Sequence, residues 1–258
     1  MIRNVLRSFG LRSKTSSTAR GAQHRPDFPP PSTEQDVAVI ADVHGMLRPF
    51  EALLQRLARE VPQARVVCVG DLIDRGDQSA DVLRLAFECR DTLTVIMGNH
   101  EEMLLRFLDD PAQEGARWFR YGGLQTLASF GISPPGAAAE ASHFNEVRDR
   151  LRAAIGPQVE AWVRRLPRHL VSGNIAVTHA GADPWLPISQ QSDTALTWGH
   201  PDFGRRNRTD GLWIVHGHVI VHAPVAVGGV ISIDTGAYAG GGLTAAVISA
   251  DPVRFFTE

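Results

Sequence analysis

The chain has 258 residues, enough for one sizeable domain with a well-buried core, and no shift in composition marks a second domain. Hydrophobic residues make up 43% and charged residues 21%, as in ordinary globular proteins, and no apolar run approaches the ~18–20 residues that cross a bilayer. A formal net charge of −2 gives no overall attraction to nucleic acid or to anionic membranes, so neither is expected as a partner.

The cysteine content argues against a disulfide framework. Only Cys68 and Cys89 are present, and they do not form a C-x-x-C pair. Cys68 lies within the apolar run 66–69, where a small buried thiol is expected. We therefore expect a reducing compartment and a cytoplasmic location.

The N-terminal segment differs in composition from the rest of the chain. Before Pro29 it carries six basic residues and a single acid, Asp27, and it then reaches three consecutive prolines. Such a segment can bury little apolar surface, so we expect a disordered basic tail over residues 1–35 and a single domain over residues 36–258. An organelle-targeting peptide, which is also Arg- and Ser-rich, is the alternative for the tail.

The first half of the domain alternates short apolar runs with amphipathic stretches. Val37–Ile40 predicts a strand, and residues 47–57 predict a helix because their leucines and phenylalanine recur at helical spacing. Two further predicted strands, Arg65–Val69 and Leu93–Met97, flank a predicted helix over Ala80–Glu88. Strand, loop and helix in repeated order predict an α/β fold with largely parallel strands.

Residues 101–170 are predicted to be helical, with a loop at Pro134-Pro135-Gly136. The expected packing anchors of this region are Trp118, Phe119, Leu124, Leu127 and Trp162. The last third predicts strands again, at Ile175–Val177, Leu212–Val215, Val230–Ile233 and Thr244–Ile248. Gly228-Gly229 and Gly240–Gly242 are typical of the turns of hairpins.

Polar residues follow the predicted strands at their carboxyl ends, where ligands gather in α/β folds. They are Asp42, His44, Asp71, Asp74, Arg75, Asn99, His100, His179 and His218. Carboxylate, imidazole and amide groups without thiolates are ligands for Mn, Fe or Zn, and six of these residues could supply two metals that share one carboxylate. Two such metals can activate a hydroxide near neutral pH and hold a phosphoryl group for in-line attack.

Most of these motifs also have a purely structural explanation. Asn99 suits a helix cap, and His179 suits a hydrogen-bonded core histidine. Residues 71–76 are harder to explain in that way, because two acids and an arginine directly follow a buried strand and unpaired buried charges are costly. Of His216 and His218, at most one is expected to be a ligand. Taken together at one edge of the fold, the motifs favour a metal site.

Five motifs, in this order, resemble those of the calcineurin-type metallophosphoesterases: Asp-x-His-Gly (42–45), Gly-Asp-x-x-Asp-Arg-Gly (70–76), Gly-Asn-His-Glu (98–101), His-Ala-Gly (179–181) and Gly-His (217–218). The second and third are typical of the phosphoprotein phosphatase branch, especially its small bacterial and bacteriophage lambda members. Residues 122–131 and 233–237 also resemble the bacterial subgroup. The resemblance covers about residues 37–248 and implies a four-layer αββα sandwich.

The resemblance implies two divalent metal ions, with Mn as the first choice and Fe or Zn as alternatives. The implied metal ligands are Asp42, His44, Asp71, Asn99, His179 and His218, with Asp71 bridging. His100, oriented by Asp74, would protonate the leaving oxygen, and Arg75 would hold phosphate oxygens with its planar guanidinium. The attack would come from a metal-bridging hydroxide, without a phosphoenzyme.

The chain departs from the family pattern at two positions. Where a Trp-x-Arg segment usually supplies a second phosphate contact, this chain has His200 in the arginine position. His200 itself, or the following Arg205, Arg206 or Arg208, would have to supply that contact, which is worth on the order of 1.5–3 kcal/mol. Val219 replaces the usual threonine after Gly-His and would alter hydrogen bonding around the metal ligands. The expected substrate contacts are therefore Arg75, Asn99, His200, Arg205 and Arg206.

Three functions follow from the sequence. The first is a phosphomonoesterase acting on phosphoserine or phosphothreonine in proteins, which would make a phosphorylated protein the partner. The alternative uses the same two metals on a small phosphorylated substrate, a dinucleoside polyphosphate or inorganic polyphosphate, because fold alone does not fix the substrate. The third is a non-catalytic binding protein, which conflicts with the presence of every ligand position and of the His100–Asp74 pair.

Overall fold

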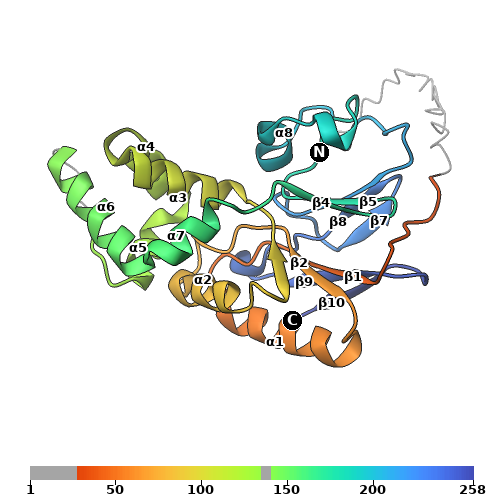
Figure 1. Ribbon diagram of the computed structural model, residues 1–258, viewed down its shortest axis with the longest axis horizontal. Helices are drawn as coiled ribbons and strands as arrows, with labels where there is room; N and C mark the ends of the chain where they lie inside the picture. Colours follow the sequence, from red (N-terminus) through yellow and green to blue (C-terminus); the bar gives the residue numbers. More distant parts are fainter. Residues whose placement is uncertain (1–27, 135–140) are drawn as a thin grey trace, which may run out of the picture.

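The computed structural model describes residues 28–134 and 141–258, and in it two mixed five-stranded sheets pack against each other between helices (Figure 1). The first sheet has the order β10-β9-β1-β2-β3 and the second β4-β5-β6-β8-β7. The strands are β1 (Val37–Ile40), β2 (Arg65–Cys68), β3 (Leu93–Val95), β4 (His169–Ser172), β5 (Ile175–Thr178), β6 (Trp213–His216), β7 (Val225–Val227), β8 (Val230–Ser232), β9 (Thr244–Ile248) and β10 (Arg254–Thr257). The expected αββα architecture is confirmed.

The helices cover the outer faces of the sheets and form a separate group beside them (Figure 1). They are α1 (Leu47–Glu60), α2 (Ser79–Glu88), α3 (Asn99–Asp109), α4 (Pro111–Trp118), α5 (Leu124–Ser129), α6 (Ala141–Ile155), α7 (Pro157–Val163) and α8 (Asp193–Trp198), with a π turn η1 (Phe119–Gly123) and short 3₁₀ turns η2 (Ile188–Gln190) and η3 (Ala237–Ala239). Among these described helices, none is both long and apolar enough to cross a membrane.

The first sheet follows from the strand–helix alternation of the sequence. The strands β1, β2 and β3 are parallel, and the crossover helices α1 and α2 connect them. Helix α1 buries Phe50, Leu53 and Leu57, which confirms its amphipathic pattern. Strand β1 is buried throughout and entirely apolar, as expected of a strand that is covered on both faces. The antiparallel β9 and β10 complete the sheet.

The second sheet is parallel at its centre, where β6 lies between β5 and β8, and antiparallel at its edges. Helix α8 covers its outer face, where Leu196 packs with Ala176 and Ile214. The glycine pair 228–229 joins β7 and β8 as a hairpin, as predicted. The hairpin predicted at 240–242 is wrong, because β8 and β9 belong to different sheets and this segment crosses between them.

The middle of the chain is helical, as predicted, and most of its anchors are buried. Trp118 and Leu127 have no exposed surface, and the indole of Trp162 packs edge-on against Phe87. Leu124 was wrongly expected as an anchor: it is 41% exposed, because α5 begins after the π turn and directs this side chain outward. The loop expected at Pro134-Pro135-Gly136 lies mostly outside the described residues.

The end of the expected tail packs on the second sheet. Asn174 forms two hydrogen bonds with Ser32: its backbone N–H donates to the Ser32 carbonyl (2.9 Å), and its side-chain Oδ1 accepts the Ser32 N–H (2.6 Å). The Trp213 indole donates to the Pro29 carbonyl (2.7 Å) and its ring meets Phe28 edge-on. Residues 1–27, which make up most of the expected basic tail, lie outside the described part of the chain.

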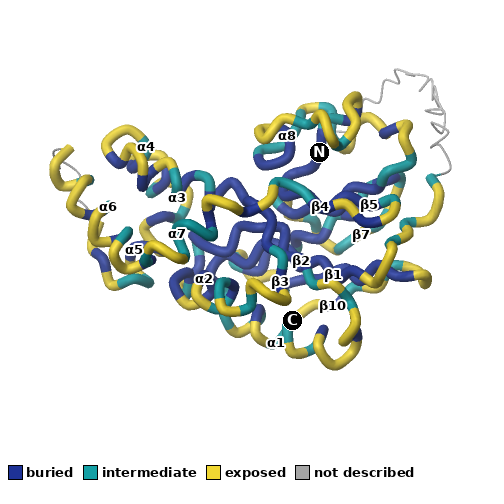
Figure 2. Tube along the Cα trace, in the orientation of Figure 1, coloured by how far each residue is buried: buried dark blue, intermediate teal, exposed yellow. Residues whose placement is uncertain are grey.

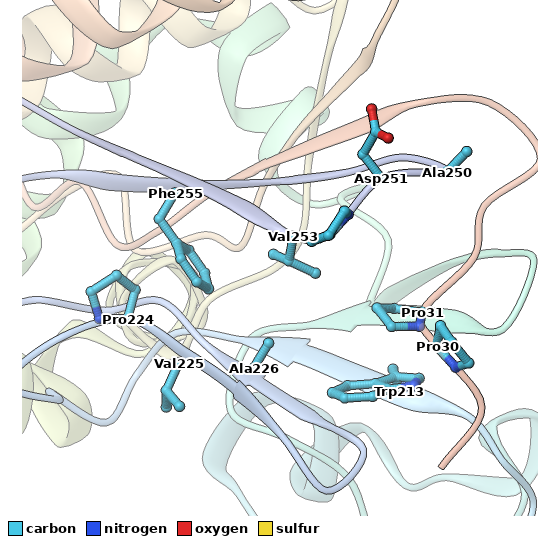
Figure 3. A pocket seen from close by; sticks show the side chains of 11 residues that line it. Pro30, Pro31, Trp213, Pro224, Val225, Ala226, Ala250, Asp251, Val253 and Phe255 are labelled. Atoms are coloured by element: carbon cyan, nitrogen blue, oxygen red, sulfur yellow. The ribbon is translucent and has the colours of Figure 1, made fainter.

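A cavity of about 710 Å³ lies between this proline segment and the edge strands β7 and β10 (Figure 3). Its lining includes Pro30, Pro31, Trp213, Val225 and Phe255, and its single ionisable residue is Asp251. A lining of this kind offers no constellation of acid, base and ligand groups. The catalytic candidates lie elsewhere, at the carboxyl ends of the parallel strands.

Candidate active site

The polar clusters predicted from the sequence meet between the two sheets, in a region that is buried along most of its length (Figure 2). The loops after β1, β2 and β3 supply one set of side chains, and those after β5 and β6 supply the other. Within the described residues, the non-glycine residues with positive φ are His44 (45°), Asp71 (50°), Asp74 (70°), Arg75 (69°) and His218 (63°). All five belong to this site, where backbone strain is typical of functional geometry.

Asp71 is the centre of the candidate metal ligands. Its Oδ2 lies 3.5 Å from His44 Nε2 and 3.4 Å from His179 Nε2. Two groups of closely spaced ligand atoms form around it, one with His44 and His100 and one with His179 and His218. A carboxylate common to two such groups is what a bridging ligand requires.

The other predicted ligands join the same cluster. The Oδ1 of Asn99 lies 2.8 Å from His179 Nε2 and 2.9 Å from His218 Nδ1. Asp42 accepts the backbone N–H of His218 at both carboxylate oxygens (3.0 and 3.1 Å). His216 is directed elsewhere and hydrogen-bonds Ser232, so only one histidine of this pair faces the cluster.

The hydrogen-bond chemistry of His179 fits a cation. Its Nδ1 lies 2.9 Å from the Val69 carbonyl, and its Nε2 faces the acceptor oxygens of Asn99 and Asp71. A neutral imidazole carries one N–H and cannot donate on both sides, so a metal at Nε2 would satisfy these acceptors. His44 is held in the same way, with Nδ1 2.8 Å from the Ile73 carbonyl.

The electrostatics of the buried cluster also favour a metal. Burial raises the pKa of Asp42 and of Asp71 well above the usual range, and nearby carboxylates raise both further. Burial lowers the pKa of His44 and of His179, which favours the neutral imidazole that a metal ligand requires. Carboxylates that repel one another in a buried site are stabilised by divalent cations. With oxygen and nitrogen donors and no thiolate, the residues present fit Mn, Fe or Zn.

His100 and Asp74 form a tightly held pair beside this cluster. His100 donates from Nδ1 to Asp74 Oδ2 (2.7 Å), and the same carboxylate accepts from Trp118 Nε1 (2.9 Å) and Thr126 Oγ1 (2.6 Å). Burial raises the pKa of Asp74 to about 7 and lowers the pKa of His100. The opposite nitrogen, His100 Nε2, is buried and has no hydrogen-bond partner among the described residues. It is therefore available to a reacting oxygen.

Arg75 borders the cluster on its exposed side. Its Nη1 lies 3.1 Å from His44 Nε2, and its guanidinium stacks over the Tyr238 ring at 4.5 Å. The Tyr238 ring also meets the imidazole of His44 edge-on, 5.0 Å between centroids. A planar cation held at the edge of the metal cluster is suited to bidentate contact with phosphate oxygens.

The remaining predicted substrate contacts are not joined to the cluster by hydrogen bonds. His200 Nε2 faces Asp183 Oδ2 at 3.7 Å, and Arg205 and Arg206 are exposed on the loop after α8. Arg208, which the sequence left as a possible substitute, is buried and donates to the carbonyls of Asp183 and Leu186 (3.0 Å each). It therefore joins the loop after α8 to the segment before α8, and its Nε donates to Asp210, so these donors are already used.

Sequence reasoning assigned no role to Glu101 or Tyr238, although both belong to the site. Glu101 is fully buried and accepts the backbone N–H groups of Asp71 and Leu72 (2.8 Å each), so it fixes the strained turn that carries the shared ligand. Glu101 is the last residue of the Gly-Asn-His-Glu motif (98–101), and this position could have indicated a role in the site. Tyr238 had only the weaker signal of lying just after the motif-like stretch 233–237.

The chain belongs to the calcineurin-like phosphoesterases, whose family model matches residues 36–222. It is therefore a metallophosphoesterase, a hydrolase of phosphoric ester bonds, as the sequence predicted.

Proteins similar to this chain carry more specific names. It is 30% identical over 234 residues to bis(5′-nucleosyl)-tetraphosphatase PrpE (asymmetrical) of Bacillus velezensis, covering 80% of this chain and 86% of that protein. It is 28% identical over 255 residues to a symmetrical bis(5′-nucleosyl)-tetraphosphatase of Pseudomonas fluorescens, covering 80% and 85%. A crystal structure of a candidate diadenosine tetraphosphatase superposes with a TM-score of 0.62 at 20% identity, covering 89% of this chain and 96% of the other.

Proposed function

We propose that this protein hydrolyses dinucleoside polyphosphates, using two divalent metal ions, with Mn as the first choice. The observation that carries the catalytic part is the carboxylate of Asp71, which belongs to two groups of ligand atoms at once. Support for the substrate class comes from relatives named bis(5′-nucleosyl)-tetraphosphatases that align along 80% of the chain. This was the alternative function expected from the sequence, and it now takes precedence over phosphoprotein hydrolysis.

In this proposal the metals are held by the six predicted ligands, Asp42, His44, Asp71, Asn99, His179 and His218. When bound, they would neutralise phosphate charge and supply an activated water at neutral pH. Arg75 binds oxygens of the phosphate under attack. One P–O bond of the polyphosphate would break as the phosphorus gains the oxygen of water. For this step His100 must carry a proton on both nitrogens: Asp74 holds Nδ1–H, the Nε2 proton goes to the leaving oxygen, and a proton released from the water restores it.

Hydrolysis of phosphoserine or phosphothreonine in proteins is the second candidate. The motifs Gly-Asp-Leu-Ile-Asp-Arg-Gly and Gly-Asn-His-Glu favour it, whereas His200 in place of the usual arginine weakens it. The non-catalytic alternative has the least support, because both the ligand cluster and the His100–Asp74 pair are complete. The free thiols of Cys68 and Cys89 suit the proposed cytoplasmic location.

The test is a parallel assay of the Mn-loaded protein with diadenosine tetraphosphate and with a phosphoserine peptide. We expect a kcat/KM at least about tenfold higher for the dinucleotide, and chromatography of the products would show whether two ADP or ATP plus AMP are formed. Asp71→Asn is the control, because it should abolish both activities. Faster release from the peptide would reverse the order of the two candidates, and no release from either substrate would contradict both.

A further inference from the structure

An open pocket of about 670 Å³ is lined in part by Arg75, which borders the metal-ligand cluster. Its walls come from two segments that are distant in sequence: η1 together with the start of α5, and η3. The lining residues are Arg75, Phe119, Arg120, Tyr121, Gly122, Leu124, Gln125 and Tyr238. Arg75 therefore links this pocket to the ligand cluster, because its guanidinium lines the pocket and its Nη1 lies 3.1 Å from His44 Nε2.

The backbone fixes the position of the pocket relative to Arg75. Gly122, at φ 118°, accepts the Arg75 N–H at its carbonyl (3.4 Å), and a Cβ there would lie 2.6 Å from that nitrogen. The five-residue π turn that contains Gly122 interrupts the run of helix between α4 and α5. Gly122 has non-helical backbone angles, so the chain kinks here, and Arg120 and Tyr121 directly before the kink line the same pocket as Arg75.

The chemistry of the lining matches a nucleotide. It contains two arginines and no carboxylate, together with the rings of Phe119, Tyr121 and Tyr238. Tyr121 is 49% exposed and Leu124 is 41% exposed, so both present apolar surface to solvent at the rim. Aromatic faces stack on planar bases, and arginines bind phosphate groups. A phosphoserine side chain has a phosphate but no planar ring to occupy the remaining surface.

We propose that this pocket binds one nucleoside end of a dinucleoside polyphosphate, with the base on Tyr121 and a phosphate beyond the scissile bond on Arg120. The proposal rests on the proposed function and adds its specificity determinants. Arg75 contacts the phosphate under attack, and the pocket holds the part of the substrate that a simple phosphomonoester lacks.

The test compares a substrate that carries nucleosides with a substrate that carries none. For each variant, kcat/KM is measured with diadenosine tetraphosphate and with p-nitrophenyl phosphate. The readout is the value for the dinucleotide divided by the value for p-nitrophenyl phosphate. In Tyr121→Ala the ratio falls about tenfold, mainly through KM of the dinucleotide, because stacking of a base is lost. Tyr121→Phe keeps the aromatic ring, so its ratio should equal that of the wild type. Arg120→Ala lowers the ratio, whereas Arg150→Ala, an exposed arginine on α6 outside the pocket, leaves it unchanged.

The outcomes separate this proposal from the proposed function. If the wild type cleaves the dinucleotide and both pocket variants keep the wild-type ratio, the pocket assignment is overturned and the function stands. If the wild type cleaves only p-nitrophenyl phosphate, the proposed function fails, and inhibition of that reaction by AMP then decides the pocket. An inhibition constant about tenfold higher in Tyr121→Ala than in wild type supports it, and equal constants, or no inhibition of the wild type, overturn it.

Discussion

Replacement of Gly122 by alanine should both destabilise the fold and damage the site. At φ 118° an L side chain is strained, which costs about 1–2 kcal/mol. The added Cβ would also lie 2.6 Å from the Arg75 nitrogen and 3.0 Å from the Asp74 Cβ, so the packed backbone must move. Overpacking of this kind costs about 1–3 kcal/mol. Together the free energy of unfolding should fall by about 2–5 kcal/mol.

Gly131→Ala provides a matched control within the same segment. Gly131 also has positive φ (69°), but a Cβ there would meet no atom within 4 Å. Backbone strain without overpacking should cost about 1–2 kcal/mol. The difference between the two variants therefore isolates the contact of Gly122 with the backbone of Arg75.

Urea unfolding of both variants, loaded with Mn and followed by circular dichroism, gives the two free energies. Activity gives a second readout, because displacement of Arg75 by about 1 Å can cost on the order of a hundredfold in rate. We expect kcat/KM on the dinucleotide to fall at least about tenfold in Gly122→Ala and less than about twofold in Gly131→Ala. Equal destabilisation of the two variants, with activity retained in both, would refute the reasoning.

Three further predictions concern the metal cluster and the His100–Asp74 pair. His100→Ala should lower kcat on phenyl phosphate by about 10²–10⁴-fold, and by much less on p-nitrophenyl phosphate, whose leaving group needs no proton; equal losses would contradict the acid role. Thr126→Val removes both buried hydrogen bonds of the Thr126 hydroxyl with Asp74, one to the carboxylate and one from the backbone N–H. It should lower the free energy of unfolding in urea by about 1–3 kcal/mol, and Thr126→Ser should restore it. Mn²⁺ at about 1,000 times its Kd should stabilise the metal-free protein by about 4 kcal/mol in thermal unfolding. In Asp71→Asn, Mn²⁺ should give little of this stabilisation. Without metal, this variant should be no less stable than the wild type, because a buried carboxylate that repels its neighbours is gone.

Local sequence patterns predicted those helices and strands in which apolar residues recur regularly. Apolar periodicity located α1 and α2, and the runs of β-branched residues located β1 and β9. Strands β4, β7 and β10 were not predicted, because their residues are only partly buried, in contrast to the fully buried β1 and β9, and their apolar pattern is correspondingly weaker. The crossing at residues 240–242 resembles a hairpin turn locally, and only the pairing of β9 with β1, far back in the chain, shows that it is not.

The ligand cluster was predictable because each of its residues follows a strand and the carboxyl ends of parallel strands meet. The residues that line the substrate-binding side of the site could not be predicted in this way. The contact between Arg75 and Tyr238 joins the loop after β2 to the distant segment that crosses from β8 to β9, and the wall formed by Gly122 depends on a kink that periodicity cannot indicate. Arg208 shows the converse, since its charge suggested a phosphate contact, while in the structure it is buried and donates to the carbonyls of Asp183 and Leu186 in the segment before α8.

The five positive-φ residues of the site have a consequence for the lifetime of the protein in the cell. If each costs about 1 kcal/mol, the sum is about 5 kcal/mol, comparable with the whole net stability of a typical domain. Bound metals would offset this strain, so a chain that has not acquired them should open more often and be cut sooner by proteases. A shorter half-life in a protease digest after chelation, reversed by Mn²⁺, would show that metal supply sets how long each copy survives.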